Sequence, residues 1–327
     1  MRHRWLAAAL CLGLAACAKA PVVTLRYTHP NASGSIAGMQ ADFFAHKAAE
    51  YSGGAVRVEV YPDSGVGSLR DQVSLVASGV SAINHSTAAA IGLLYRDFAV
   101  LDTPYLYGSV QHLLRVVAPE SPVMKRLSAG ILKSSGLRVL YVFYFGTREL
   151  SCDRPILRPE DLSGLKVRSI PFPIYETAVE GLGAQAIPLD WSETAAALAT
   201  HAVNGQENPV NTILSAGLYK TQGYLMLTNH ILGAEIVVMN DAAWRKLSRE
   251  AQRGLMRAAA EASAYATRLT SESEGADIEA LRERGMKVIG PADGLDRPSF
   301  AIRTKRLVRE RYGAEWSEYY RLIDSLR

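Results

Sequence analysis

The chain has 327 residues, 48% of them hydrophobic and 21% charged, and a formal net charge of +4. This composition is typical of a globular protein and excludes long disordered segments, and the small net charge excludes a strongly basic nucleic-acid-binding protein. The length predicts two lobes, because a single hydrophobic core stops growing at about 250–300 residues. Past residue 20, no apolar run approaches the ~20 residues that a helix needs to cross a bilayer.

The N-terminal residues 1–20 are predicted to be an export signal. Arg2 and Arg4 precede an apolar run over residues 5–16, and small residues follow. That run is too short for a membrane-spanning helix, and a buried first helix is the alternative. Leu14-Ala15-Ala16-Cys17 resembles the lipobox at which bacterial lipoproteins are acylated, whereas cleavage after Ala20 would give an ordinary secreted protein. Only Cys152 then remains in the body of the chain, so no internal disulfide is expected.

The first half of the chain alternates between predicted strands and helices. Residues 22–29 alternate apolar and polar side chains, as a strand does, and Pro30 follows them. Apolar residues at helical spacing predict a helix over 35–51, which Gly53 and Gly54 end. The same reasoning predicts strands at 56–62, 81–86 and 137–146, a Gly-rich turn with a helix within 63–79, and a helix at 122–136.

A second series of the same kind begins after Pro155. Asp190 followed by Glu193 is a capping-box pattern that fixes the start of one of its helices. The series comprises strands at 165–170, 184–189 and 234–240 and helices at 174–183 and 190–203. Alternation of this kind predicts an α/β fold with a mainly parallel sheet and ligand-binding groups at the ends of its strands.

Residues 248–284 form a Pro-free stretch rich in Ala, Glu, Arg and Leu, interrupted by Gly254 and Gly275. One helix over this stretch would extend for roughly 50 Å at 1.5 Å per residue and would brace both lobes. Two helices meeting near Gly275 are the alternative. Basic residues gather only at 303–311, which is interpreted as the solvated face of another helix, so no nucleic-acid partner is expected.

Several common catalytic motifs are missing from the sequence. It contains no GxSxG, GxxxxGK[ST], HExxH or CxxC pattern, and its Gly-rich segments lack the GxGxxG spacing. The seven His residues are dispersed, with none at helical spacing from another. The commonest nucleophilic, nucleotide-binding and zinc sites are therefore not expected, and neither a cofactor nor a metal is predicted.

Two arginines are placed where a charge is costly. Arg168 lies in a strand that must be mostly buried, and its guanidinium does not lose its proton. A buried Arg without an anion costs several kcal/mol, so either an internal Asp or Glu or a ligand must supply negative charge. Arg148 raises the same question at the end of the preceding long strand. Two such residues in one cleft would suit a carboxylate, which the planar fork of Arg binds through two hydrogen bonds, and Gln206 and Asn208 could donate amide hydrogens beside them.

The stretch "GLKVRSI…GAQAIPLDWSETAAALATHAVNGQENPVNTI…YLMLTNHI" resembles the core of the extracytoplasmic solute-binding proteins of tripartite ATP-independent periplasmic (TRAP) transporters, of the dicarboxylate-binding type. The resemblance extends more loosely to nearly the whole mature chain. It implies a periplasmic protein of two α/β lobes that close on an organic acid and deliver it to integral membrane subunits. It further implies Arg168 as the carboxylate anchor, Arg148 as a second cationic contact, Asn208 in the pocket lining and Trp191 facing the cleft.

This sequence also departs from that family. Asn204 stands where an Asp-Gly pair is usual before "QENP", and His201 replaces a common Gly. His85 falls at a strand end where family members choose ligand contacts. Trp191, Phe172 and Tyr175 would permit an aromatic or branched ligand, although aromatic residues near a cleft are as often part of the core.

The chain is predicted to form two lobes connected by one long helix. The first comprises 21–145 plus about 232–260, the second 146–231 plus about 285–327, and the helix at 248–284 spans both. Two other functions remain open on the residues alone. One is a periplasmic enzyme acting on a small organic acid, with Glu207 or His85 as general base. The other is the periplasmic component of an ATP-driven importer, which shares the two-lobed plan.

Overall fold

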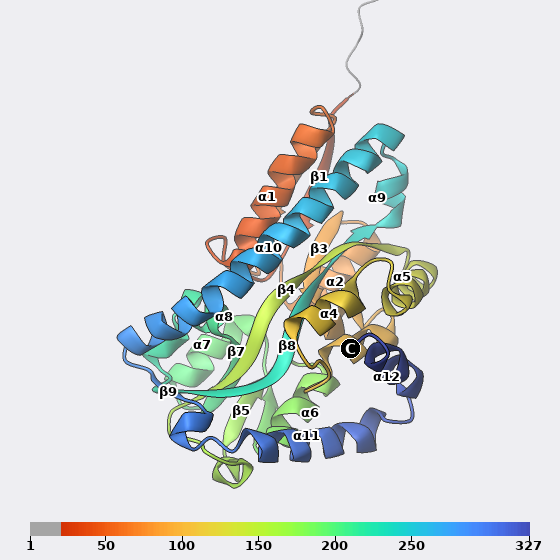
Figure 1. Ribbon diagram of the computed structural model, residues 1–327. Coiled ribbons are helices and arrows are strands. Elements are labelled where there is room, and N and C mark those ends of the chain that lie inside the picture. Colours follow the sequence, from red (N-terminus) through yellow and green to blue (C-terminus); the bar gives the residue numbers. More distant parts are fainter. Residues whose placement is uncertain (1–20) are drawn as a thin grey trace, which may run out of the picture.

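One mixed β-sheet connects the upper and lower parts of the computed structural model, which describes residues 21–327 (Figure 1). The predicted export signal, with Cys17, lies outside the described residues. The strands are β1 (Val23–Thr28), β2 (Val56–Tyr61), β3 (Ile83–Thr87), β4 (Leu137–Cys152), β5 (Lys166–Ser169), β6 (Gln185–Pro188), β7 (Gly205–Pro209), β8 (Tyr224–Asn240) and β9 (Lys287–Ile289).

The strand order is β2-β1-β3-β8-β4-β7-β5-β6, with β9 beside β8. Within residues 21–327, five of the eight strand pairings are parallel, and the three antiparallel ones all involve β4 or β8. The expected two-lobed α/β fold with a mixed, mainly parallel sheet is therefore confirmed.

Strands β4 and β8 are longer than the sequence predicted. They have 16 and 17 residues and pair with each other along most of their length. Their register shifts three times, once between Tyr144 and Gly146. Gly146 has φ 126°, a backbone angle that favours glycine, and a Cβ there would lie 2.8 Å from Pro209. The prediction ended β4 at this glycine, whereas the strand continues past it as a bulge.

Helices cover both faces of the sheet (Figure 1). The predicted capping box of Asp190 and Glu193 is present at the start of α7. The helices are α1 (Ile36–Tyr51), α2 (Leu69–Ser78), α3 (Ala88–Ile91), α4 (Val110–Val117), α5 (Pro122–Ser135), α6 (Pro173–Leu182), α7 (Trp191–Ala199), α8 (Val210–Ser215), α9 (Asp241–Arg245), α10 (Arg249–Glu283), α11 (Arg297–Tyr312) and α12 (Ser317–Asp324), with short 3₁₀ turns η1 (Arg96–Asp102), η2 (Pro159–Leu162), η3 (Leu218–Lys220) and η4 (Pro291–Asp293).

Helix α10 is one unbroken helix of 35 residues, so the alternative of two helices meeting near Gly275 is wrong. It packs against α1, β4 and α8 in turn (Figure 1). Gly254 allows the close approach to α1, because a Cβ there would lie 2.7 Å from the carbonyl oxygen of Tyr51. Further along, Glu274 accepts hydrogen bonds of 2.7 Å from the backbone N–H of Thr147 and from the hydroxyl of Tyr144.

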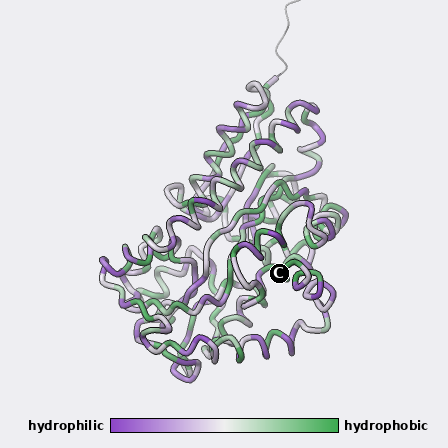
Figure 2. Tube along the Cα trace, in the orientation of Figure 1, coloured by the Kyte–Doolittle hydropathy of each residue, from purple (hydrophilic) through white to green (hydrophobic). Residues whose placement is uncertain are grey.

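Helices α10 and α11 alternate between hydrophilic and hydrophobic residues along their length (Figure 2). In α11 the residues Phe300, Val308 and Tyr312 are buried, whereas the basic residues of 303–311 are exposed. The interpretation of that patch as a solvated helix face is confirmed. Within residues 21–327, no helix combines the length and the apolar character that crossing a membrane requires.

Candidate binding site

A small cavity of about 40 Å³ lies where β4, β5, β7 and β8 meet the loop after β1 and the first residues of α7. It contains four of the six predicted ligand-binding residues, namely Arg148, Arg168, Trp191 and Asn208. His85 and Phe172 do not line it. The full lining is Pro30, Asn31, Leu69, Thr87, Phe145, Arg148, Arg168, Ile170, Trp191, Asn208, Thr212 and Glu235.

Arg148 is buried and already has an internal partner. Its Nε and Nη2 donate to the two carboxylate oxygens of Glu207 at 2.5 and 2.8 Å. Nη2 also donates to the Glu207 carbonyl at 2.7 Å and to Asn208 Oδ1 at 3.1 Å. His230 Nε2 lies 3.0 Å from the same carboxylate. Strand pairing builds this arrangement, because Arg148 of β4 stands opposite Pro209 at the end of β7.

The charges of this pair stabilise each other. Burial would raise the pKa of Glu207, but the adjacent Arg148 guanidinium and the His230 hydrogen bond lower it to about 2. Burial opposes the charge on Arg148 too, yet Glu207 raises the pKa of Arg148 above its usual value. Glu207 is therefore ionised and fully engaged at neutral pH, a state unsuited to a general base that must exchange protons near pH 7.

Arg168 differs from Arg148 because its guanidinium is only partly satisfied. The side chain is 1% exposed, and its Nε donates to the Leu189 carbonyl at 2.9 Å. Nη1 and Nη2 are buried and have no hydrogen-bond partner among the described residues. Its guanidinium carbon lies 6.0 Å from the centre of the Trp191 ring. Burial lowers the pKa of Arg168 to about 10, so it remains protonated at neutral pH. Within residues 21–327, no Asp or Glu forms a salt bridge with it.

The amides of β7 form a short chain that ends at the cavity. Gln206 Nε2 donates to Ser151 Oγ at 2.8 Å, and Asn208 Nδ2 donates to Gln206 Oε1 at 2.5 Å. All five residues of β7 are buried, although the sequence analysis predicted no strand there. Asn208 is thereby fixed between Gln206 and Arg148 with its side chain at the cavity wall.

Glu235 is a cavity residue that the sequence reasoning missed. It lies on β8 opposite Thr87 of β3 and is 3% exposed. Its Oε2 has no hydrogen-bond partner among the described residues. Burial raises the pKa of Glu235 well above its usual value, and the nearby Asp102 raises it further. Glu235 is the one acidic residue in the apolar run "AEIVVM". That could have identified it, just as a charge in a mostly buried strand identified Arg168.

His85 is buried behind the cavity wall. Its Nδ1 accepts from the Tyr27 hydroxyl at 2.9 Å and lies 3.1 Å from Gln40 Nε2, while its Nε2 donates to Asn31 Oδ1 at 3.0 Å. Burial lowers the pKa of His85 well below its usual value, so the ring is neutral. His85 therefore positions Asn31, which does line the cavity.

Phe172 lies in a different place. It immediately precedes α6, is 2% exposed, and contributes to a separate cavity of about 380 Å³ beside Tyr312 and Trp316.

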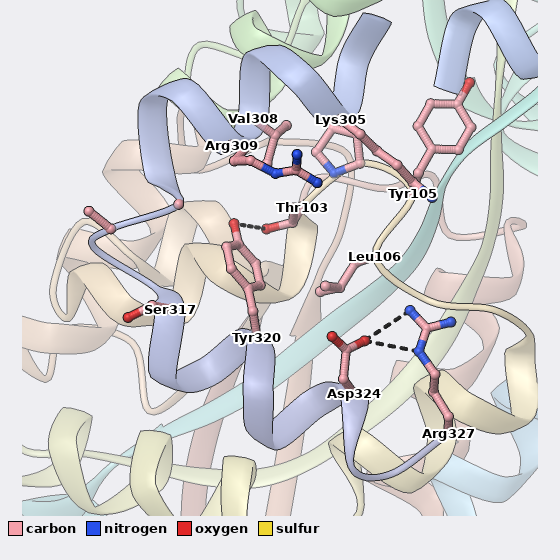
Figure 3. Close-up of a pocket in the computed structure, with 13 residues that line it drawn as sticks. Thr103, Tyr105, Leu106, Lys305, Val308, Arg309, Ser317, Tyr320, Asp324 and Arg327 are labelled. Carbon is pink, nitrogen blue, oxygen red and sulfur yellow. Dashed lines mark hydrogen bonds and ion pairs between the residues drawn. The ribbon is translucent and has the colours of Figure 1, made fainter. Parts of the chain in front are cut away.

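A larger cavity, about 650 Å³, lies between the 103–106 loop and helices α11 and α12 (Figure 3). Four of its polar side chains pair with each other: Tyr320 lies 3.3 Å from Thr103, and Asp324 pairs with Arg327 at 2.9 Å. Its other cations, Lys305 and Arg309, are exposed, so water would screen their attraction for an anion. An anion gains more at the smaller cavity, where Arg168 is buried and lacks a partner.

The chain is similar to known proteins over most of its length. A family model described as bacterial extracellular solute-binding protein, family 7, matches residues 27–312. The 2,3-diketo-L-gulonate-binding periplasmic protein of Escherichia coli is 31% identical over 264 residues, which are 80% of this chain and 79% of that protein. The C4-dicarboxylate-binding periplasmic protein of Rhodobacter capsulatus is 28% identical over 280 residues, 85% of this chain and 83% of that protein.

Solved structures are similar over nearly the whole fold. A TRAP periplasmic solute-binding protein from Roseobacter denitrificans with bound L-galactonate has a TM-score of 0.85 and 26% identity, covering 94% of this chain and 99% of that one. A TRAP periplasmic solute-binding protein from Bordetella, with density interpreted as pantoate, has a TM-score of 0.85 and 28% identity, covering 93% and 98%.

These similarities show the family of the chain as well as its fold. The family model spans most of the chain, and the Escherichia coli relative is more than 30% identical over four fifths of it. The family and the proteins named above are solute-binding proteins, which rules out the alternative of an acid-processing enzyme. The chain belongs to family 7 of the bacterial extracellular solute-binding proteins, the solute-binding proteins of TRAP transporters.

Proposed function

We propose that the protein captures an organic acid in the cavity beside Arg168 and delivers it to the membrane subunits of a TRAP-type transporter. The observation that carries the proposal is the buried guanidinium of Arg168, whose Nη1 and Nη2 have no partner among the described residues. A carboxylate would satisfy both nitrogens through parallel hydrogen bonds, the geometry that Arg and carboxylates share.

The neighbouring Arg148 plays a different part in this proposal. Glu207 neutralises its charge, and its Nε and Nη2 are occupied by Glu207 and Asn208. Only Nη1 makes no hydrogen bond to a described residue. Arg148 therefore fixes Asn208 at the cavity wall, and Nη1 supplies the second cationic contact that the family resemblance implied. Trp191 limits the space around Arg168 from the other side.

Binding involves movement of the lobes. The cavity of about 40 Å³ is far smaller than the roughly 300–1,000 Å³ of common ligand pockets. An acid of several carbons therefore enters only when the cleft opens, and closure then removes water from the Arg–carboxylate pair and strengthens it. A ligand that contacts both lobes stabilises the closed form, which the membrane subunits would recognise. The lobes in question are those predicted at 21–145 plus about 232–260 and at 146–231 plus about 285–327.

The ligands of similar proteins support the chemical class. The names of the relatives and solved structures include 2,3-diketo-L-gulonate, C4-dicarboxylates, L-galactonate and pantoate, all of which carry a carboxylate. The predicted export signal agrees with delivery from the periplasm. The mature protein would then either begin after Ala20 or be attached to lipid at Cys17.

Isothermal titration calorimetry on point variants tests the anchor. An initial thermal-shift screen of mono- and dicarboxylates identifies an acid that binds. Arg168→Ala should then weaken binding by about 100-fold or more, because an unpaired buried carboxylate costs several kcal/mol, and Arg168→Lys should lose much of the affinity through its non-planar head group. Arg309→Ala, which removes an exposed cation from the cavity of about 650 Å³, is the matched control and should bind as wild type does. Wild-type affinity in Arg168→Ala would refute the anchor, and loss of binding in Arg309→Ala would move the site to the other cavity.

A further inference from the structure

A second unsatisfied group shares the cavity with Arg168. Glu235 is 3% exposed, its Oε2 has no partner among the described residues, and its side chain lines the cavity from the β8 side. A buried carboxyl group without a hydrogen bond is costly, so its retention points to a partner that arrives from outside the protein. Thr87, directly opposite on β3, also lines the cavity.

The charges around the cavity limit what that partner can be. Arg148 and Glu207 neutralise each other, which leaves Arg168 as the one cation of the cavity wall without an ionic partner among the described residues. One carboxylate on the ligand balances it. Arg148 has only Nη1 free of hydrogen bonds, and Glu207 already balances its charge, so a second carboxylate beside Glu235 would meet no unbalanced cation of the described lining. Two anions side by side in a buried site repel strongly.

We propose that Glu235 binds a hydroxyl group of the ligand, so that the protein prefers a hydroxylated monocarboxylate to an unsubstituted dicarboxylate of the same length. The inference rests on the proposed function, because it assumes that Arg168 holds the carboxylate of the same molecule. It adds a specificity determinant on the opposite wall of the cavity.

A hydroxyl fits Glu235 better than other groups because it both donates and accepts. It donates to an ionised carboxylate and accepts from a protonated carboxyl, so it satisfies Glu235 in either protonation state. A second carboxylate satisfies only the protonated form. An ammonium group satisfies only the ionised form, which burial and the neighbouring Asp102 disfavour. Family similarity does not decide between these classes, since relatives named for a sugar acid and for C4-dicarboxylates are 31% and 28% identical.

The test compares matched ligands by calorimetry on the mature protein. D-erythronate, butyrate and succinate have four carbons each and carry, respectively, hydroxyls with one carboxylate, one carboxylate alone, and two carboxylates. L-galactonate, hexanoate and adipate form the same series at six carbons. In wild type we expect the hydroxy acid of at least one series to bind 10-fold or more tightly than both of its analogues. A succinate or adipate affinity equal to or above that of the hydroxy acid overturns the proposal.

Variants then assign the preference to one side chain. Glu235→Leu should reduce the ratio of hydroxy-acid to deoxy-acid affinity by at least 10-fold, while Glu235→Gln, which still donates and accepts, should retain part of it. Glu149→Gln is the matched control, because Glu149 is an equally buried carboxyl on β4 that lies outside the cavity and accepts from the Asn229 backbone at 2.7 Å. The ratio in that variant should equal the wild-type ratio.

The outcomes separate this inference from the proposed function. Loss of all acid binding in Arg168→Ala with an unchanged affinity ratio in Glu235→Leu would leave the anchor standing and overturn the role of Glu235. No binding of any acid in either series, or in the wider carboxylate screen, would overturn both. Tighter binding of an α-amino acid such as threonine than of its hydroxy acid counterpart would show that Glu235 pairs with an ammonium group and would also overturn the proposal. Circular dichroism and the melting temperature establish that each variant is folded.

Discussion

Replacing Glu207 by Gln should destabilise the protein strongly, because it removes the counter-ion of a buried arginine. Arg148 is 1% exposed and donates two hydrogen bonds to the Glu207 carboxylate, at 2.5 and 2.8 Å. Gln retains the shape and one acceptor oxygen but not the charge. Breaking a buried ion pair from one side costs about 3–5 kcal/mol, since the remaining charge is desolvated and uncompensated.

The pKa of Glu207 points in the same direction. Burial would raise it, but Arg148 and the His230 hydrogen bond lower it from 4.5 to about 2, so the ionised carboxylate favours the folded state. Because the folded pKa is depressed, this contribution is present above pH ~4.5 and is lost as the pH falls towards 2. At the ~2 cal/mol/K of unfolding entropy per residue typical of proteins, 3–5 kcal/mol across roughly 300 residues lowers the melting temperature by about 5–8 °C.

Differential scanning calorimetry without added acid measures this effect. The melting temperature of Glu207→Gln should fall by about 5–8 °C at pH 7, and the difference from wild type should narrow at pH 3. The double variant Arg148→Met/Glu207→Leu removes both charges and should recover much of the loss. A decrease of less than about 2 °C at pH 7, or a double variant no more stable than the single one, would refute the account of Arg148 and Glu207 as mutually dependent charges.

Three further predictions concern packing, ligand and processing. Gly254→Ala should lower stability by about 1–3 kcal/mol in thermal unfolding, because the new Cβ would lie 2.7 Å from the carbonyl oxygen of Tyr51. Gly275→Ala, whose Cβ would meet no atom within 4 Å, should raise stability by up to about 1 kcal/mol. Equal effects of the two substitutions would contradict the close packing of α1 on α10. A cognate acid at 100 times its dissociation constant should stabilise the folded protein by about 2.7 kcal/mol, a rise of about 4 °C, and no rise should occur in Arg168→Ala. Intact-mass analysis of the exported protein should show removal of the signal, with a diacylated Cys17 or a chain that begins after Ala20; a full-length mass would contradict export by this signal.

The sequence pointed to the candidate site through a charged residue in an apolar strand. Arg168 in an apolar strand was a recognisable anomaly, and in the structure its outer nitrogens lack a partner. The question of an internal counter-ion could not be answered from the sequence. Glu207 is nearer to Arg168 than to Arg148 along the chain, and only the pairing of β4 with β7 assigns it to Arg148. Glu235 was an anomaly of the same kind that was not recognised.

The fold was predictable where hydrophobic periodicity is simple. The α/β alternation and α10 follow from such patterns. Strand β7 was missed because its central residues are polar. They can be buried because Ser151 and Arg148 of β4 form hydrogen bonds with the side chains of Gln206 and Asn208. The full lengths of β4 and β8 were also missed. Strand β4 continues beyond Gly146 and β8 begins well before Gly233, and these segments pair with partners that are distant in sequence.

The contact between α10 and β4 restricts how the cleft can open. A helix of 35 residues is stiff over some 50 Å, and this one is held at one end by its packing on α1 and further along by Glu274. Strand β4 bulges at Gly146, between the two residues that Glu274 holds. A rotation of the proposed lobes about this bulge would act directly on the two hydrogen bonds of Glu274, so its carboxylate would limit the amplitude of the motion.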